Sequence, residues 1–212
     1  MKKVSLFLGM VLMAAVIMVA TPASAQSRQQ SKDAKKEAKR LEKEGFKTMS
    51  IPIIRQLEDF YSRMAERQDD GTPKYLMATE RATGNSYSAA QMEALNVAKV
   101  RLAGQVQTMV MSQAKIDLAN ASLSAEEAAS VTKALEKSTL MVAQRMSRVI
   151  VAEEYYRVLS NKNYEVVVVL LYDSKAVREQ VLADARAELQ KELDAFTPEH
   201  EKLLDDACSA IK

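Results

Sequence analysis

The feature that most constrains the fold is a row of small and apolar residues that recurs at every fourth position within residues 88–112. Four-residue spacing places the whole row on one side of an α-helix. The row consists of Ala90, Ala94, Ala98, Leu102, Val106 and Val110. The alanines let the helix backbone approach a flat partner closely, and the larger residues fill a wider gap further along. The sequence therefore predicts a helix that packs against a sheet.

The most strand-like run in the chain is Tyr164 to Tyr172, YEVVVVLLY. Its β-branched and aromatic content favours a strand, and its unbroken apolar character indicates that both faces are covered. Residues 148–158 could prolong the preceding helix, but their β-branched and aromatic content also favours a strand. The turn-like residues 160–163 between these two runs predict a hairpin. Residues 74–83 predict one further strand.

Apolar residues at helical spacing predict helices before and after these strands. One helix covers residues 52–67, and another begins with a capping box formed by Ser124 and Glu127. Two more follow the hairpin, beginning at Asp173 and at Thr197. The sequence thus predicts an α+β fold, in which a small antiparallel or mixed sheet of about three strands packs against the Ala-rich helix, with further helices before and after it.

The first 25 residues predict a secretory signal peptide. Lys2 and Lys3 precede a mostly apolar run at residues 6–20, and small residues surround a cleavage site between Ala25 and Gln26. The run is shorter than the roughly 20 residues that span a bilayer, although an uncleaved anchor is the alternative. We expect a bacterial periplasmic protein without a transmembrane span in its mature chain. A peripheral position at the outer membrane is a further alternative.

Cysteine content and net charge argue against several classes of protein. Cys208 is the only cysteine, so no disulfide can form within the chain. A lipoprotein carries its lipid on a cysteine directly after the cleavage point, where Gln26 stands, so we expect no lipid. Lys2 and Lys3 account for the net charge of +2, which leaves the mature chain balanced. We expect no nucleic-acid partner, because such proteins carry an excess of positive charge.

Residues 26–45 predict a polar, basic helical arm that precedes a single domain at residues 46–212. Ala34, Ala38 and Leu41 form a thin apolar stripe on one side of this arm. Beside the stripe, one helical face carries a basic strip made of Lys32, Lys35, Lys36, Lys39, Arg40 and Lys43. One interpretation is a solvated, frayed helix, and the other is a strip that contacts anionic lipid or an acidic polymer. The thin stripe predicts little gain from docking, so we expect the arm to be mobile.

No set of residues suggests catalysis, a metal site or a cofactor. His200 has no second His or Cys at ligand spacing, and we expect it to be solvated near a helix start. Cys208 shares a helix face with apolar residues and should behave as a small buried hydrophobe. Glu153 and Glu154 are adjacent on the expected strand and therefore face opposite ways. Residues 69–73, DDGTP, lack the alternating acids of a calcium loop and predict a turn.

The region from Tyr75 to Tyr172 resembles the small outer-membrane lipoprotein-twenty family, whose relatives include flagellar lipoprotein P. The residues that carry this resemblance are Ala90, Ala94, Ala98, Arg101, Leu102 and Ala103, together with the run YEVVVVLLY. The segments KKEAKRLEKEGFK, DGTPKY, LSAEEAASVTK and SNKNYEV resemble still more closely a group of uncharacterised secreted proteins of the Bacteroides type. The resemblance implies an envelope-located structural or interaction module with a small α+β fold. It brings no catalytic residues, and the missing lipid-attachment cysteine departs from it.

These observations predict a non-enzymatic, exported structural or interaction protein of the cell envelope. Its partner would be an envelope protein or an anionic envelope component. A carrier for an apolar ligand is one alternative, and it would require an internal apolar pocket. A hydrolase with a site assembled from scattered carboxylates is the other, and it would require converging acids of raised pKa in a cleft. The sequence does not determine the oligomeric state.

Overall fold

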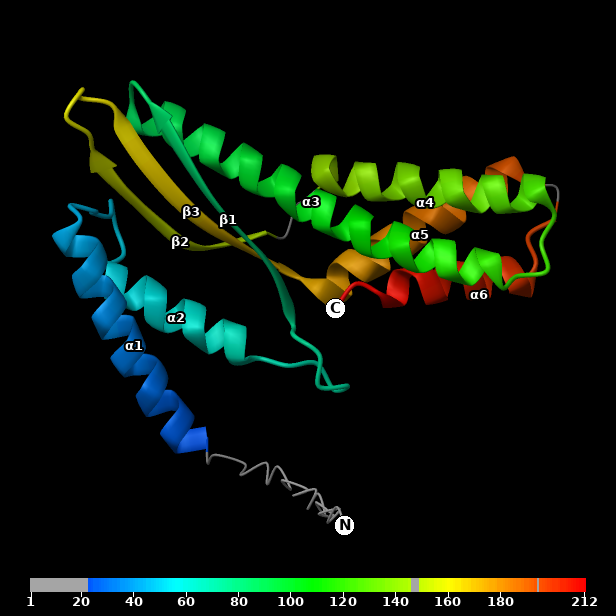
Figure 1. The fold of residues 1–212 in the computed structure, drawn as a ribbon, viewed down its shortest axis with the longest axis horizontal. Helices are drawn as coiled ribbons and strands as arrows, with labels where there is room; N and C mark the ends of the chain where they lie inside the picture. The colour runs from blue at the N-terminus through cyan, green and yellow to red at the C-terminus, as the bar shows by residue number, and fades with distance from the viewer. Residues whose placement is uncertain (1–22, 146–148, 194) are drawn as a thin grey trace, which may run out of the picture.

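A computed structural model describes residues 23–145, 149–193 and 195–212 (Figure 1). Within these residues the chain forms six helices and one three-stranded antiparallel sheet, which confirms the predicted α+β class. The predicted signal peptide lies outside the described residues up to position 22. In chain order the elements are α1 (Ala23–Lys43), α2 (Ile53–Ala65), β1 (Tyr75–Gly84), α3 (Tyr87–Ala119), α4 (Ala125–Arg145), β2 (Ile150–Val158), β3 (Tyr164–Asp173), α5 (Ser174–Glu192) and α6 (Pro198–Ser209).

The sheet has the order β1-β3-β2, so the apolar run of β3 is central, as predicted. Val169 of β3 lies opposite Thr79 of β1 and Glu153 of β2. The ambiguous residues 148–158 form a strand from Ile150 onward, which confirms the favoured interpretation. Lys162 in the connecting turn has a φ of 66°. This left-handed conformation is typical of a tight hairpin turn.

The long helix α3 joins the two halves of the molecule (Figure 1). Its N-terminal half lies on one face of the sheet, and its C-terminal half packs with α4 and α6 in a helical bundle that also contains α5. All six residues of the predicted row are fully buried. A side chain at Gly84 would place its Cβ 2.8 Å from the backbone nitrogen of Ala90, so glycine is needed where β1 turns into α3. The predicted helix-on-sheet packing is confirmed.

The other face of the sheet is covered by α1 and α2, which pack against each other (Figure 1). The expectation that the N-terminal segment gains little from docking is wrong. Ala34, Ala38 and Leu41 are at most 4 % exposed and pack in one cluster with Phe46 and Tyr155. Small side chains allow two helices to approach closely, so a thin stripe is sufficient to dock α1. The arm is therefore packed on the domain.

The end of α1 is fixed by a hydrogen-bonded turn. Gly45 has a φ of 86°, and the N–H of Phe46 donates to the carbonyl of Leu41 at 3.0 Å. This is the 6→1 bond of a Schellman motif, which satisfies a free carbonyl at the helix end. Because the turn also brings Phe46 against Leu41, the same residues end the helix and close its apolar contact.

The outer edge of β2 is covered by the segments that connect α1 to α2. Lys47 and Tyr156 exchange two backbone hydrogen bonds of 2.7 and 2.8 Å. The side-chain amide of Gln56 in α2 bonds both backbone groups of Glu154, with its oxygen accepting at 2.6 Å and its nitrogen donating at 3.2 Å. An exposed strand edge is a site for unwanted pairing. The α1–α2 layer thus both covers one sheet face and protects one edge.

Candidate functional site

His200 is fully buried, so the prediction of a solvated histidine is wrong. The residue completes a capping box at the start of α6: Thr197 N–H donates to its Nδ1 at 3.2 Å, and the backbone N–H of His200 donates to Thr197 Oγ1 at 3.4 Å. The ring of Phe196 stacks on the imidazole with centroids 6.1 Å apart. Glutamate and glutamine are the usual residues at this capping position, and histidine replaces them here. His200 therefore has a structural role at a helix end.

Cys208 is fully buried in the main core, as predicted. Burial raises the pKa of its thiol to about 12. The thiolate is the reactive form of cysteine, so this side chain is held in its unreactive form at neutral pH.

Glu153 and Glu154 lie on opposite faces of β2, which confirms the prediction. Glu154 points to the α3 side, where it accepts hydrogen bonds from the hydroxyl of Tyr87 and, at 2.8 Å, from Gln91 Nε2. Glu153 is only 4 % exposed and lies beneath the α1–α2 layer, with Tyr155 donating to it at 3.0 Å. The pKa of Glu153 is raised to about 7, mainly by burial; the hydrogen bond from Tyr155 opposes this shift, and the negative charge of Glu37 on α1 adds to it.

The burial of Glu153 was not predicted, although its spacing from Tyr155 indicates which neighbours it has. It stands two positions before Tyr155 on a strand, so both side chains face the same layer. The sequence alone left the identity of that layer open. The structure shows that this layer is formed by α1 and α2, because α1 packs on the domain.

Residues 69–73 form a turn, as predicted, with Gly71 at a φ of 82°. Asp70 Oδ1 accepts from Thr72 N–H at 2.9 Å and from Thr72 Oγ1 at 2.6 Å, and these bonds lower the pKa of the Asp70 carboxyl. The carboxylate is thus used within the turn. Across the described ranges, no group of three or more His, Cys, Asp or Glu side chains is arranged to hold a metal ion.

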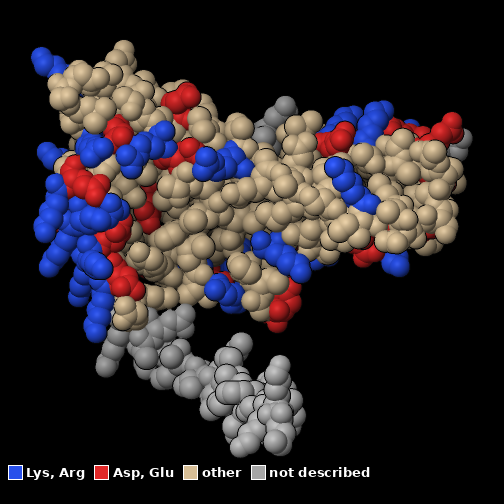
Figure 2. All heavy atoms as spheres, viewed as in Figure 1, with Lys and Arg blue, Asp and Glu red and all other residues tan. Residues whose placement is uncertain are grey.

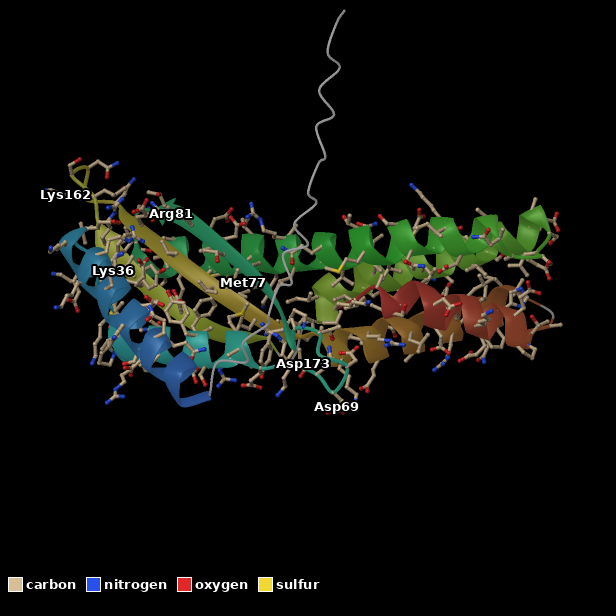
Figure 3. All side chains as sticks on the ribbon, turned by 60° about the horizontal axis from the view of Figure 1, so that its bottom comes forward. Lys36, Asp69, Met77, Arg81, Lys162 and Asp173 are labelled. Atoms are coloured by element: carbon tan, nitrogen blue, oxygen red, sulfur yellow. The ribbon has the colours of Figure 1, made fainter. Side chains whose placement is uncertain are left out.

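An open cleft of about 450 Å³ lies between this turn, the start of α5 and the end of the chain. Its lining contains charged side chains of both signs. The acidic ones are Asp69, Asp70 and Asp173, and the basic ones are Arg67, Lys74, Lys175, Arg178 and Lys212. Figure 3 shows Asp69 and Asp173 at this end of the sheet. Because carboxylates lie among the basic groups, the cleft does not indicate the charge of a ligand.

The basic strip has a clear geometry. All six of its side chains are exposed, on the side of α1 opposite the docked stripe. Figure 2 shows lysine and arginine side chains gathered along this margin of the molecule, and Figure 3 labels Lys36 among them. At 1.5 Å per residue, the strip from Lys32 to Lys43 extends over about 16 Å.

The charges of the strip are only partly neutralised by the protein. Arg40 forms ion pairs with Glu37 and Glu44, and its hydrogen bond to Glu37 lowers the pKa of that carboxyl. The five lysines of the strip form no ion pair with any acidic side chain in the described part of the chain. The docked helix therefore holds a row of solvated positive charges in a fixed arrangement.

Comparison of the chain with known protein families, with curated proteins and with solved structures found no match. The resemblance to the lipoprotein family therefore stays a prediction. Among the helices that the structure describes, none is both long and apolar enough to cross a bilayer.

Proposed function

We propose that the protein is a non-enzymatic, exported structural or interaction protein of the cell envelope, which binds an anionic lipid surface through the basic strip of α1. The observation that carries this proposal is the set of five solvated lysines on the outward face of a docked helix. Basic side chains near an anionic membrane contribute about 1 kcal/mol each. Several of them on one helix face give reversible binding that weakens as salt screens the charges.

Docking of α1 also determines the mode of binding. Ala34, Ala38 and Leu41 are buried against the domain, so the helix offers the lipid its charged face alone. An amphipathic helix that enters the bilayer must place an apolar face there. We therefore propose peripheral attachment without insertion.

The buried carboxyl of Glu153 favours this function over the hydrolase alternative. Its raised pKa is the property expected of a catalytic acid, but the group lies beneath α1 with 4 % of its surface exposed. A general acid must reach its substrate within hydrogen-bonding distance. The carrier alternative lacks a comparable supporting observation, because the cleft beside the turn is open and lined with charges.

The proposal is tested by sedimentation of the purified protein with vesicles that contain phosphatidylglycerol, and with vesicles of phosphatidylcholine alone. We expect binding to the anionic vesicles only, with a loss of binding at high salt. The double variant Lys35→Glu/Lys39→Glu should weaken binding by at least about tenfold, because it reverses two charges at the surface. The matched control Lys175→Glu/Lys202→Glu changes two exposed lysines of α5 and α6 and should leave binding unchanged.

Two outcomes would overturn the proposal. Equal binding by both double variants would mean that the strip is not the contact surface. Binding to soluble polyphosphate without binding to anionic vesicles would assign the strip to an acidic polymer instead of a lipid surface.

A further inference from the structure

A second row runs along α3, two residues out of step with the buried row and on the opposite side of the helix. Its seven members also recur at every fourth position, and each of them is exposed. This outer row consists of Met92, Asn96, Val100, Gly104, Thr108, Ser112 and Ile116. The opposite side of a helix that packs on a core is normally polar. Here four of the seven residues are Met, Val, Gly and Ile, and the polar ones, Asn96, Thr108 and Ser112, carry no charge.

The middle of the outer row is a shallow apolar hollow. It is lined by α3 residues alone, among them Val97, Val100, Gly104 and Thr108. Met92, Val100 and Ile116 are each more than half exposed. Apolar surface of this kind marks an interaction site when it is continuous.

Gly104 has no explanation within the chain. A Cβ added there meets nothing within 4 Å, and the residue lies inside a regular helix. Glycine in a helix interior costs about 1 kcal/mol relative to alanine. With Thr108 and Ser112 it forms a run of small residues at four-residue spacing, which lets a second helix backbone approach closely.

The outer row is self-complementary about Gly104. If two copies of α3 meet antiparallel with a twofold axis at this glycine, exposed Val100 faces Thr108, and exposed Val97 faces half-buried Met111. Beside the row, exposed Glu93 of one copy faces exposed Lys115 of the other, twice in the pair. We propose that the outer face of α3 is the interface of a homodimer, with Gly104 at the twofold axis.

The spacing of the facing residues determines how the helices cross. These residues recur at intervals of three or four positions, from Glu93 through Val97, Val100, Gly104, Thr108 and Met111 to Lys115. Helices that pack along such a face cross at about 20°. The backbones are then closest at Gly104, with Val100 and Thr108 filling the spaces on each side. Glu93 and Lys115 lie about 16 Å along the helix from the axis. A crossing of about 20° separates the helices there by about 6 Å more, which their long side chains can span.

The charges on this face favour a second copy over an unrelated partner. Arg101, which borders the row, is already paired with Glu80 of β1. The exposed charges that flank the ends of the row are Glu93 and Lys115, and each has its complement in the other copy. An unrelated partner would have to supply both signs at matching positions.

The first test is the mass of the purified protein by analytical ultracentrifugation over a range of concentrations. The wild type should form a dimer, and Val100→Gln should shift it to a monomer with an unchanged circular-dichroism spectrum. Leu140→Gln is the matched control, because Leu140 on α4 is 59 % exposed and Val100 is 66 % exposed. A monomeric wild type, or equal dimerisation of both variants, would overturn the proposal.

The second test isolates the charge pairing. Glu93→Lys and Lys115→Glu should each weaken the dimer by about tenfold, because each turns two attractions into repulsions. The double variant Glu93→Lys/Lys115→Glu should recover the wild-type dissociation constant. Single variants that dimerise like the wild type, or a double variant that stays as weak as the singles, would place the interface elsewhere.

Discussion

The two faces of the sheet are built differently. The face beneath α3 is covered over β1 and β3, with Ala78, Val166 and Val168 packed against the alanines of the helix. The opposite face is covered by the α1–α2 layer over β2 and β3, whereas Met77 and Arg81 of β1 stay exposed there (Figure 3). The covered part of this second face also contains a buried carboxyl.

The two faces therefore have different roles. The α3 face mainly stabilises the fold, and the α1–α2 face carries the proposed interaction surface. The α3 face supplies a largely apolar core, and the carboxyl of Glu154 on this face is half-buried and hydrogen-bonded by Tyr87 and Gln91. The α1–α2 face encloses Glu153 and holds the helix that carries the basic strip. We expect changes beneath α3 to lower the free energy of unfolding most, and changes beneath α1 to be smaller or dependent on pH.

The largest expected effect is that of a charge beneath α3. Val168→Asp should lower the free energy of unfolding by more than about 4 kcal/mol, because it buries an unpaired carboxylate at a fully buried position. Urea denaturation measures this loss. The control Val158→Asp, at a position that is 57 % exposed, should cost less than about 1 kcal/mol. Equal losses of unfolding free energy in the two variants would show that solvent reaches the core around β3.

The second effect depends on pH and belongs to the α1–α2 face. The folded-state pKa of Glu153 is about 7, above its ordinary value of 4.5. Between these values the folded protein binds more protons than the unfolded chain, so the free energy of unfolding should fall as pH rises through this range. The total change is on the order of 3 kcal/mol, and it should be absent in Glu153→Gln.

The charged and titratable groups around Glu153 are Glu37 of α1, Tyr61 of α2 and Tyr155 of β2. Only Glu153 is changed in the comparison, so subtracting the two pH profiles isolates its contribution. Parallel profiles for the wild type and Glu153→Gln would mean that the carboxyl is solvated.

The third effect compares equal changes on the two faces. Ala98→Leu on α3 should destabilise the protein by about 2–3 kcal/mol, because the helix cannot move away from the sheet without disturbing the bundle. Ala38→Leu should cost only about 1 kcal/mol, because α1 packs at the edge of the molecule and can shift. Thermal denaturation of both variants provides the comparison. A larger loss for Ala38→Leu would reverse the assigned roles of the faces.

The sequence predicted the strands, their covered centre and the buried face of α3, because these follow from residue spacing within single elements. The sequence did not predict that α1 docks. Ala34 is buried by Phe46 and by α2, and neither belongs to the helix whose spacing the prediction used. The prediction for His200 failed because the capping position is usually occupied by glutamate or glutamine. The positions of the basic strip were predicted, since residues on one helix face share a regular spacing. The docking that holds the strip in place was not predicted, because it depends on the surface of α2 and the sheet as well as on α1.

The measurement that tests the account most directly is hydrogen exchange of the backbone amides in α1. If the basic strip is held on a docked helix, the amides of residues 36–41 should exchange at least about a hundredfold more slowly than in an unstructured peptide. The amides of β3 serve as the reference for the core, and they should be protected still more strongly. Exchange of residues 36–41 at the rate of an unstructured peptide, with β3 still protected, would contradict the docked arrangement and the fixed strip that depends on it.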